Sequence, residues 1–318
     1  MKWKRNGKFV KKNNGQPIVC GTDFSATAAE AVDIAAAMAR RLETKLVLVH
    51  VDDQLLGALV SNPVLLETAT LQRRVDLDDE AQRLRDLGTN VEEKFLSGSA
   101  FDELVTAASG AKGRLIVVGA IGHGLARRLF IGSVAERTAE SSPIPTLVVR
   151  PGGRLASWIR GEHGLKILVG YDFSAASDAA LDWVNQLREI GKFQATVLYS
   201  NWPPDEARRL GFEGPLPLVT NSADVQKKLE RDLKKRVATF LRSKEVNVLV
   251  DPGWGNPEGY LFEMASRQKV DLIVVGTHQR HGLGRVLLGS VSRAVLHHAK
   301  VSVAVIPPGG SPMRKHGR

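Results

Sequence analysis

The sequence predicts an α/β protein with two tandem, doubly wound parallel-sheet domains, each in the strand order 3-2-1-4-5, packed together as a pseudo-dimer. Two observations predict this class. First, the chain repeats itself, because IVCGTDFS at 18–25 returns as ILVGYDFS at 167–174, and LIVVG at 115–119 returns unchanged at 272–276. Second, short apolar runs alternate with helical patterns within each copy, as in parallel strands joined by crossover helices. Copies of this length are duplicated domains rather than solenoid units of about 20–50 residues.

The individual elements follow this alternation in order. In the first copy, the apolar runs predict strands near 18–23, 45–51, 91–96, 114–119 and 145–150. The patterns between them predict helices near 25–42, 67–87, 99–111 and 132–141. In the second copy, strands are predicted near 166–171, 194–200, 246–250, 271–276 and 301–306. Ser25 and Ser174 stand where the first helix of each copy begins, and a serine hydroxyl there can accept from an unpaired N–H group.

The repeat also sets the domain boundaries. We assign residues 17–151 to domain 1 and residues 165–308 to domain 2, with the segment 151–165 as the linker. The fifth strand of each copy is apolar and would leave an exposed sheet edge, which is an aggregation liability. LVVR of 147–150 is therefore expected to face VAVI of 303–306 across a pseudo-two-fold axis. A further homodimer stays open.

The net charge of +10 is located almost wholly at the two ends of the chain. The tail 1–16 carries six Lys and Arg residues and no acid, and the tail 309–318 carries three, so nine of the ten excess charges are outside the domains. We therefore expect solvated tails rather than nucleic-acid or membrane binding. No apolar run approaches the roughly 20 residues of a membrane-spanning helix, and no apolar leader region follows the basic start. With Cys20 as its single cysteine, the chain is predicted to be cytoplasmic.

The residues with functional potential stand at the carboxyl ends of two strands. In an open doubly wound sheet, ligands bind beyond these ends where the strand order reverses, here between the first and fourth strands. Asp23 closes the first strand and Gly119 closes the fourth. Two separate motifs therefore converge on one point, which predicts a binding site.

The loop after the fourth strand has the composition of a phosphate-binding loop. Gly119 and Gly122 remove side chains where a ligand would approach the backbone, and they permit positive φ. Gly132 and Ser133 open the next helix, whose unpaired N–H groups and dipole favour an anion. A phosphate is therefore predicted at Gly132 and Ser133, with Asp23 placed to accept from an adenine amino group.

With these motifs the sequence resembles the universal stress protein family in its tandem form, over nearly all of residues 17–308. The family signature is glycine, two residues, glycine, nine residues, glycine and then serine or threonine, and it falls on Gly119, Gly122, Gly132 and Ser133. The resemblance implies binding of ATP or AMP, leaves a bound Mg²⁺ open, and implies a role in stress survival with no agreed catalytic reaction. The remaining nucleotide contacts that it implies in domain 1 are Gly21, Asp23, Val51, Val118 and Val134.

The second copy departs from the signature in two places. Gln279 stands at the position of Gly122, and Ser200 stands at the position of Val51. A glutamine side chain would crowd the ribose or phosphate, so domain 2 is expected to bind nucleotide weakly or not at all. Its remaining, weaker candidates are Asp172, Gly276, Gly289 and Ser290.

Three functions stay open at this level. The first is an ATP- or AMP-binding stress-response module, the second a slow ATP hydrolase or a nucleotidyl- or phosphoryl-transfer enzyme, and the third a nucleotide-free interaction protein. An enzyme would need a positioned acid, for which Asp52 and Asp53 are the nearest candidates. Neither a Walker A motif nor a G-x-S-x-G elbow is present.

Two further groups of residues are interpreted as structural. The histidines at 278, 281, 297 and 298 lack companion ligands at metal-site spacing, so no metal site is predicted. Trp202 and Trp254 fall in loops near the mouth of domain 2, where packed aromatics are the expected outcome.

Overall fold

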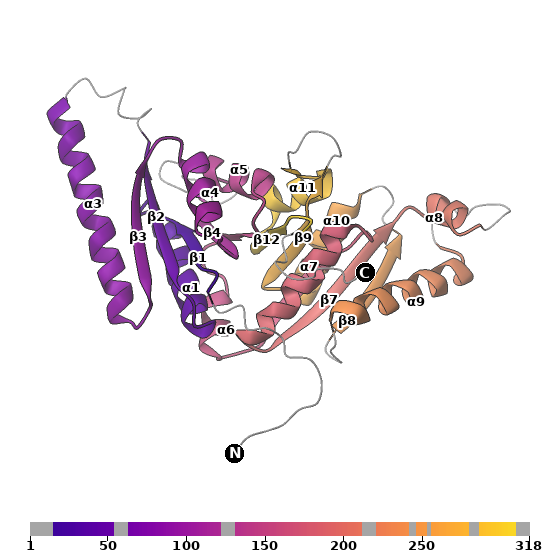
Figure 1. Cartoon of the computed structure of the whole chain (residues 1–318). Coiled ribbons are helices and arrows are strands. Elements are labelled where there is room, and N and C mark those ends of the chain that lie inside the picture. The colour runs from indigo at the N-terminus through magenta and orange to yellow at the C-terminus, as the bar shows by residue number, and fades with distance from the viewer. Residues whose placement is uncertain are drawn as a thin grey trace, which may run out of the picture.

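A computed structural model describes residues 15–53, 63–121, 131–211, 221–241, 246–252, 256–279 and 286–309. Ten strands form one continuous sheet in the order β3-β2-β1-β4-β5-β12-β9-β6-β7-β8 (Figure 1). The strands of domain 1 are β1 (Ile18–Gly21), β2 (Leu46–Asp52), β3 (Val91–Ser97), β4 (Leu115–Gly119) and β5 (Thr146–Val149). Those of domain 2 are β6 (Leu165–Gly170), β7 (Phe193–Asn201), β8 (Val246–Pro252), β9 (Leu272–Gly276) and β12 (Ser302–Ile306).

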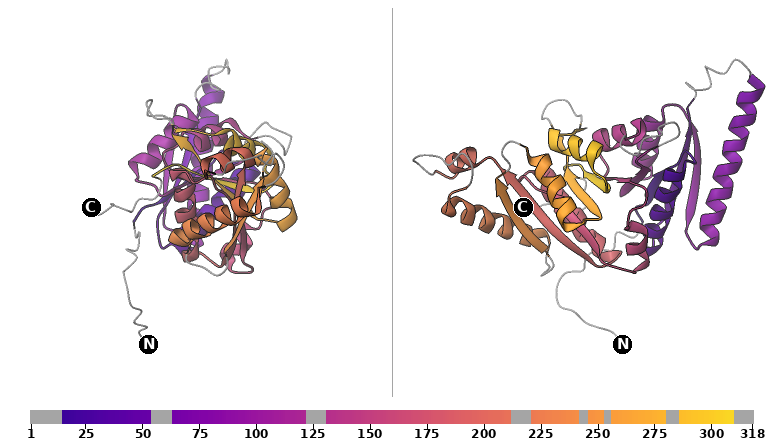
Figure 2. Two further views of the ribbon diagram at one scale, coloured as in Figure 1. Left: turned by 90° about the vertical axis from the view of Figure 1, so that its right-hand side faces the viewer. Right: turned by 180° about the vertical axis from the view of Figure 1, so that it is seen from behind.

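The predicted strand order 3-2-1-4-5 is confirmed in both halves of this sheet. Neighbouring strands within each domain are parallel. The two halves meet where β5 pairs antiparallel with β12, with Val148 opposite Val303 and Leu147 opposite Ala304. This pairing is the expected contact between the fifth strands, and it makes the two domains a pseudo-dimer with one sheet running through both (Figure 2).

Helices cover both faces of the sheet. One face carries α1 (Ala26–Arg41), α3 (Pro63–Asp86), α6 (Leu155–Arg160), α7 (Ala175–Gln186), the short η1 (Leu187–Glu189) and α9 (Ala223–Phe240), with α8 (Pro203–Arg209) after β7. The other face carries α4 (Ala100–Gly110), α5 (Ser133–Ser141), α10 (Pro257–Gln268) and α11 (Ser290–His298). Strand side chains alternate between two hydrophobic clusters, so that Ile18 and Cys20 pack on the first face and Val19 packs on the second. No helix in the described part of the chain is both long and apolar enough to cross a bilayer.

The first helix of each domain begins as the sequence predicts. The Ser25 hydroxyl accepts from the Ala28 N–H at 3.2 Å, and the Ser174 hydroxyl accepts from the Ser177 N–H at 3.1 Å. Each cap satisfies one of the N–H groups that the first turn leaves unpaired. Each cap follows the carboxyl end of the first strand in its domain. The caps therefore fix the direction in which the chain leaves that end of the sheet.

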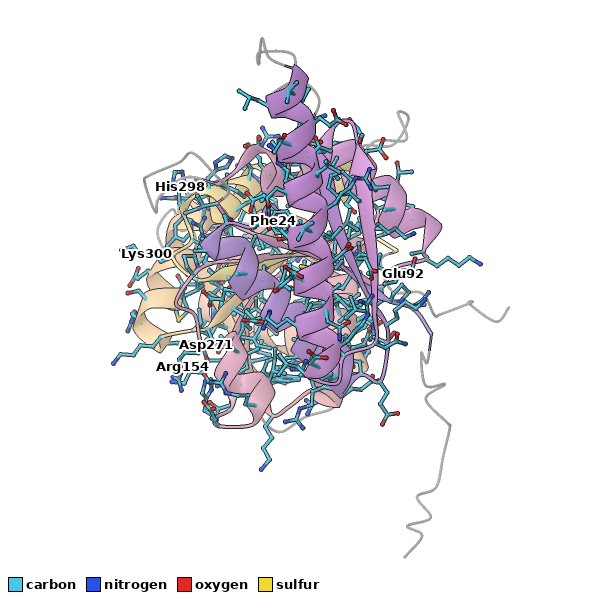
Figure 3. All side chains as sticks on the ribbon, turned by 90° about the vertical axis from the view of Figure 1, so that its left-hand side faces the viewer. Phe24, Glu92, Arg154, Asp271, His298 and Lys300 are labelled. Carbon is cyan, nitrogen blue, oxygen red and sulfur yellow. The ribbon has the colours of Figure 1, made fainter. Side chains whose placement is uncertain are left out.

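The linker is more structured than its composition suggests, because it contains the buried helix α6. Leu155, Trp158 and Ile159 are each at most 3% exposed and belong to the hydrophobic cluster that includes α1 and α7. The Arg154 guanidinium lies 3.9 Å from the Asp271 carboxylate, and Figure 3 labels the two side chains beside each other. The Asp271 carboxylate also accepts from the Lys166 N–H at 2.9 Å. Helix α6 is therefore packed between the domains and contributes to their common core, while most residues on either side of it are exposed.

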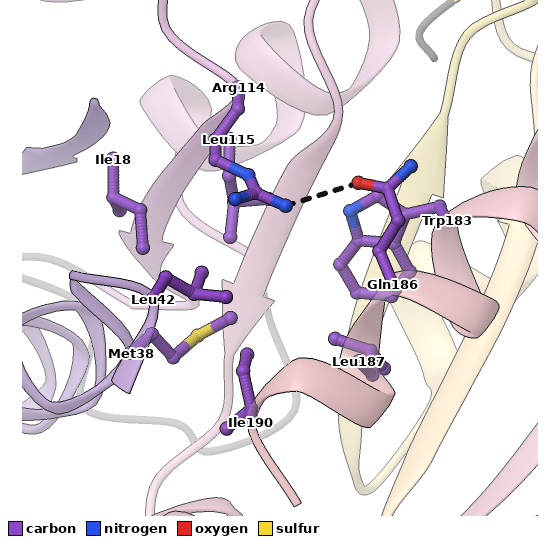
Figure 4. Close-up of a pocket in the computed structure, with 9 residues that line it drawn as sticks. All are labelled: Ile18, Met38, Leu42, Arg114, Leu115, Trp183, Gln186, Leu187 and Ile190. Atoms are coloured by element: carbon purple, nitrogen blue, oxygen red, sulfur yellow. Dashed lines mark hydrogen bonds between the residues drawn. The ribbon is translucent and has the colours of Figure 1, made fainter. Parts of the chain in front are cut away.

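A small cavity remains where α1 of domain 1 faces α7 and η1 of domain 2 (Figure 4). It has a volume of about 20 Å³, which is room for roughly one water molecule. The Arg114 guanidinium at its edge donates to the Gln186 side-chain oxygen at 3.2 Å. The residues around it are Ile18, Met38, Leu42, Arg114, Leu115, Trp183, Gln186, Leu187 and Ile190. Its size makes it a packing defect of the domain interface rather than a ligand site.

Candidate functional site

The candidate site of domain 1 lies where β1 and β4 end side by side. The register pairs Cys20 with Val117, so the residues that follow these strands, Asp23 and Ala120, continue on neighbouring paths. The Thr27 hydroxyl in the first turn of α1 donates to the Ile121 carbonyl after β4. The Gly132 N–H donates to the Ala120 carbonyl at 2.8 Å. The chain after β1, the chain after β4 and the start of α5 are therefore bonded into one assembly.

Asp23 is held in a tight turn. Its carboxylate accepts from the Ser25 N–H at 3.0 Å, and the Thr22 hydroxyl accepts from the Phe24 N–H at 3.1 Å. These bonds stabilise Phe24 at φ 62°, in the left-handed region that a bulky residue rarely adopts. The same turn recurs in domain 2, where Phe173 has φ 62° and the Asp172 carboxylate accepts from the Ser174 N–H. One function of this aspartate is thus to shape the turn that presents it.

Gly119 has a packing role that the sequence interpretation did not include. A Cβ atom at Gly119 would lie 3.0 Å from the carbonyl carbon and oxygen of Thr27, so the glycine is required by the close approach of α1. Gly276 in domain 2 is under the same constraint, because its Cβ would lie 2.7 Å from the Ala176 carbonyl carbon. Gly21 likewise faces Leu104 of α4 at 3.1 Å. These glycines are explained by helix packing alone, and by themselves they do not indicate a ligand.

The start of α5 has the features expected of an anion site. Gly132 is its N-cap residue with φ −73° and ψ 147°, and it has no side chain to occupy the helix N–H groups. Ser133 follows as an exposed first helical residue, and Val134 packs against the hydrophobic cluster beneath it. In domain 2, Gly289 and Ser290 begin α11 in the same way. Gly122, the second glycine of the signature, lies outside the described residues.

The wall beside Asp23 is apolar in domain 1. Val118 is 4% exposed and belongs to the hydrophobic core. Val51 at the end of β2 and Leu96 at the end of β3 are opposite each other in register, and both pack against the same cluster. Sequence reasoning named Val51 but missed Leu96, although the alternation of β3 places it on the same face. This surface is suited to the flat face of an aromatic ring.

Asp52, a candidate acid of the enzyme hypothesis, is held by α3. Its carboxylate accepts from the Thr70 hydroxyl at 2.8 Å and forms an ion pair with the Arg73 guanidinium at 2.8 Å. Both partners come from a helix whose packing onto β3 cannot be read from local sequence. We therefore assign Asp52 a structural role, in which it holds α3 against the sheet. In the described part of the chain, no three His, Cys, Asp or Glu side chains gather in a way that could hold a metal ion.

Domain 2 differs around the corresponding point. Gln279 lies in the two-residue strand β10 (His278–Gln279), opposite Val286 of β11 (Val286–Leu287). These two strands pair antiparallel, and β11 contacts α5. Trp202 was expected to be packed, but it is 39% exposed, because it stands at the N-cap of α8 while Pro203 takes the buried place. Trp254 lies outside the described residues.

A buried histidine supports the Asp23 turn from the other face of the sheet. His50 is 6% exposed between the rings of Phe24 and Phe95, at centroid distances of 4.6 and 5.4 Å, and its Nδ1 donates to the Thr22 carbonyl at 2.8 Å. Burial lowers the pKa of the His50 imidazole below its ordinary value, against the opposing effects of the Thr22 carbonyl and the Asp52 carboxylate. His50 is therefore neutral in the folded protein at pH 7.

This histidine predicts acid sensitivity. Because the folded-state pKa is lowered, the unfolded chain binds a proton that the folded chain resists, so stability falls as the pH decreases below about 6.5. His50→Gln keeps a donor for the Thr22 carbonyl and should reduce the loss of unfolding free energy between about pH 7.5 and about pH 5, measured by urea unfolding. The exposed His298→Gln is the matched control. An equal pH dependence in wild type and His50→Gln would show that His50 is not the responsible group.

Comparison with known proteins agrees with this architecture. Residues 15–150 and 165–307 each match the universal stress protein family. Universal stress protein A homolog 2 of Coxiella burnetii is 35% identical over 150 residues, covering 46% of this chain and 97% of its own. A universal stress protein of Mycolicibacterium smegmatis is 26% identical over 311 residues, covering 92% of this chain and 97% of its own. The crystal structure of a universal stress protein from Archaeoglobus fulgidus covers 93% of this chain and 99% of its own with a TM-score of 0.67 at 17% identity, a likeness of fold. Both domains, and with them nearly the whole chain, belong to the universal stress protein family.

Proposed function

We propose that the protein is a cytoplasmic stress-response module that binds ATP or AMP in domain 1. The observation that carries this proposal is the bonded assembly at the ends of β1 and β4, in which the Asp23 turn and the start of α5 are joined through Thr27, Ile121, Ala120 and Gly132. This assembly supports a site in which Asp23 accepts from an adenine amino group and the N–H groups at the start of α5 hold a phosphate. The apolar residues Val51 and Leu96 supply a surface for the ring.

Within this proposal the phosphates interact with the α5 N–H groups and the Ser133 hydroxyl. Mg²⁺, where ATP brings it, would be bound through phosphate oxygens, since Asp52 is engaged by Arg73 and Thr70. Because Asp52, the nearest acid at the end of β2, already has structural partners, we favour nucleotide binding over hydrolysis. Hydrolysis or group transfer is the second hypothesis, and the third is an interaction protein that binds no nucleotide.

Calorimetry with ATP tests the proposal through Asp23 and Gly122. Asp23→Asn can still accept from the Ser25 N–H, but it replaces the other carboxylate oxygen by an amide donor, which faces an adenine amino group unfavourably. We expect at least about tenfold weaker binding, equivalent to about 1.4 kcal/mol. Gly122→Gln, which copies the residue of domain 2, should weaken ATP binding by a similar or larger factor.

The outcomes separate the three functions. ATP binding to the wild type that is weakened in both variants supports the proposal. Failure of the wild type to bind ATP or AMP contradicts it and leaves the interaction protein. Release of inorganic phosphate with Mg²⁺, abolished in Gly122→Gln, would instead support the enzyme. Thermal unfolding of each variant checks that the domain remains folded.

A further inference from the structure

The outermost helix of domain 1, α3, exposes an apolar stripe. Val64, Leu71 and Val75 are 69%, 56% and 50% exposed, and Leu65 beside them is 61% exposed. Six large apolar side chains are exposed in the described part of the chain, and these four all lie in the first half of α3. Single apolar side chains on a surface are ordinary, whereas a contiguous group of them marks a contact surface.

The stripe takes no part in packing α3 onto the sheet. Leu77, Ala81 and Leu84, in the second half of the helix, are at most 1% exposed and belong to the hydrophobic core. Because each helical residue is rotated by about 100° from the one before it, Leu71 and Val75 project away from that buried row. Figure 3 looks onto the outer side of α3, and no other described helix or strand covers it there.

The corresponding helix of domain 2 shows that the fold does not require such a stripe. Helix α9 covers β8 at one end of the sheet as α3 covers β3 at the other (Figure 1). The apolar row of α9 is buried, and none of the exposed large apolar side chains described in the chain lies on it. Its outer side instead carries Lys227, Arg231, Lys234 and Lys235, which are all exposed. The apolar outer side is therefore a specific property of α3.

The stripe has the spacing of a contact between two helices, and this spacing is the same in both directions. Val64, Thr68, Leu71 and Val75 are separated by four, three and four residues, as are the a and d positions of a coiled coil. A half-turn about an axis through the middle of the stripe therefore places Val64 against Val75 of a second copy, and Thr68 against its Leu71. The Thr68 hydroxyl donates to the Val64 carbonyl at 2.8 Å, so it can be covered without leaving a polar group unsatisfied.

The charges beside the stripe match in the same arrangement. Glu67 and Arg74 are exposed seven residues apart along one side of it. The half-turn brings Glu67 of each copy beside Arg74 of the other, so two ion pairs flank the apolar contact. The Arg74 guanidinium already lies 4.1 Å from the centre of the Phe95 ring, which holds it on this side of the helix. Spacing and charge therefore both favour an antiparallel pair of identical helices.

Two other contacts are disfavoured by the charges of this region. A helix that lies on anionic lipid needs cations beside its apolar side. Three of the four arginines of α3 instead form ion pairs with acids of domain 1, and Asp78 and Asp79 are exposed directly beyond the stripe. Association through the edge of the sheet is opposed by Glu92, Glu93 and Lys94 on the edge strand β3.

We propose that α3 is a homodimer interface, in which two copies of the chain join by antiparallel pairing of their stripes over residues 64–75. The same surface of both copies forms the contact, so the assembly closes with two chains and leaves neither stripe exposed. This interface is separate from the β5–β12 pairing, which joins the two domains within one chain. The resulting dimer has the two α3 helices at its centre and one α9 helix toward each end.

Sedimentation velocity on the whole chain tests this interface. The wild type should show a concentration-dependent equilibrium between one chain of 34.6 kDa and a species of twice that mass. Leu71→Asp together with Val75→Asp should weaken dimerisation at least about hundredfold, because the half-turn gathers four carboxylates in the apolar contact. Both side chains are exposed in the single chain, so the melting temperature of the monomer should not change. Leu87→Asp changes an exposed leucine outside the stripe, and this matched control should dimerise as the wild type does.

An exchange of charges tests the antiparallel arrangement. Glu67→Arg and Arg74→Glu should each weaken dimerisation by about three- to tenfold when the variant is alone, since like charges then replace two exposed ion pairs. Mixing the two variants should restore dimerisation, because each copy of one variant then meets opposite charges on the other.

Four results would overturn the inference. The first is a wild type that stays monomeric at every concentration, or a dimer that the two aspartates leave unchanged. The second is a mixture of the charge variants that dimerises no better than either alone, because the helices would then not be antiparallel in this register. The third is growth beyond two copies, which would mean that the stripe meets a different surface of the next chain. The fourth is binding of the monomeric wild type to vesicles of phosphatidylcholine and phosphatidylglycerol that is lost in the double variant, because a lipid surface would then cover the stripe.

Discussion

Trp158→Ala is expected to lower the free energy of unfolding by about 3–5 kcal/mol, the range typical of deleting a buried aromatic side chain. Trp158 is 2% exposed on α6, and its indole N–H donates to the Lys192 carbonyl at 2.7 Å. The neighbouring Gly191 is shaped to it, since a Cβ there would lie 2.7 Å from the Trp158 Nε1 atom. Gly191 has no side chain with which to fill the space that the ring leaves. Urea unfolding of the whole chain measures the effect.

Two variants separate packing from hydrogen bonding in this prediction. Trp158→Phe keeps most of the ring but removes one of the two hydrogen bonds to the Lys192 carbonyl, which still accepts from the Leu165 N–H at 3.0 Å. It should therefore lose only about 0.5–1.5 kcal/mol. Trp202→Ala removes a tryptophan that is 39% exposed and should change stability by no more than about 0.5 kcal/mol. If Trp158→Ala destabilises the protein no more than Trp202→Ala does, α6 is not part of the common core.

The inner strands of the sheet were predictable because they are buried on both faces. Runs such as LIVVG, flanked by glycine or polar residues, have few structural alternatives, and they became β4 and β9. Because the sequence repeats, the elements predicted in one copy supported those predicted in the other. Each apolar fifth strand had an edge that needed to be covered, and the two strands cover each other by pairing. The boundaries shifted by one or two residues, as at β1, which ends at Gly21 because the chain turns at Thr22.

The linker helix α6 shows why elements that depend on distant contacts could not be predicted from the sequence. The six residues of α6 are too short a pattern for a helical period, and the burial of Trp158 depends on Gly191 and Lys192, which are distant in sequence. Asp52 was open to a catalytic interpretation for the same reason. Its partner Arg73 comes from α3, and only the packing of that helix on the sheet brings the two together.

For the candidate site, the sequence predicted its position but not every reason for the residues that stand there. The convergence of Asp23 and Gly119 follows from strand order alone. The close packing of α1 on Gly119 does not, because it depends on the distance between a helix and a strand. The alignment of Ser200 with Asp251 and Thr277 in domain 2 was equally hidden, because it becomes visible only once the register of four strands is known.

Arg150→Ala is expected to lower the free energy of unfolding by about 2–4 kcal/mol. In the described part of the chain, Arg150 is the buried side chain that joins the end of β5 to α11 by hydrogen bonds. Arg150 is 5% exposed, and its guanidinium donates to the Leu296 carbonyl at 2.9 Å and to the His297 carbonyl at 3.4 Å. These carbonyls lie in the last turn of α11, where they lack partners within the helix and where the helix dipole favours a cation. Its N–H also donates to the Ser302 hydroxyl at 3.1 Å.

Two effects oppose each other at this residue, and Arg150→Met decides between them. Because Arg150 is buried, its charge is desolvated, which lowers the pKa of the guanidinium and reduces the net gain from its hydrogen bonds. Methionine keeps the apolar stem and removes both the charge and the bonds. We expect the bonds to dominate, because removing them leaves the buried Leu296 carbonyl and the part-buried His297 carbonyl without this donor at a helix end. Arg150→Met should therefore retain at least half of the loss seen in Arg150→Ala. Urea unfolding and amide hydrogen exchange at the β5–β12 pairing measure this. A Met variant as stable as the wild type would mean that desolvation outweighs the hydrogen bonds. The two domains would then be held together by the sheet and its apolar cover alone.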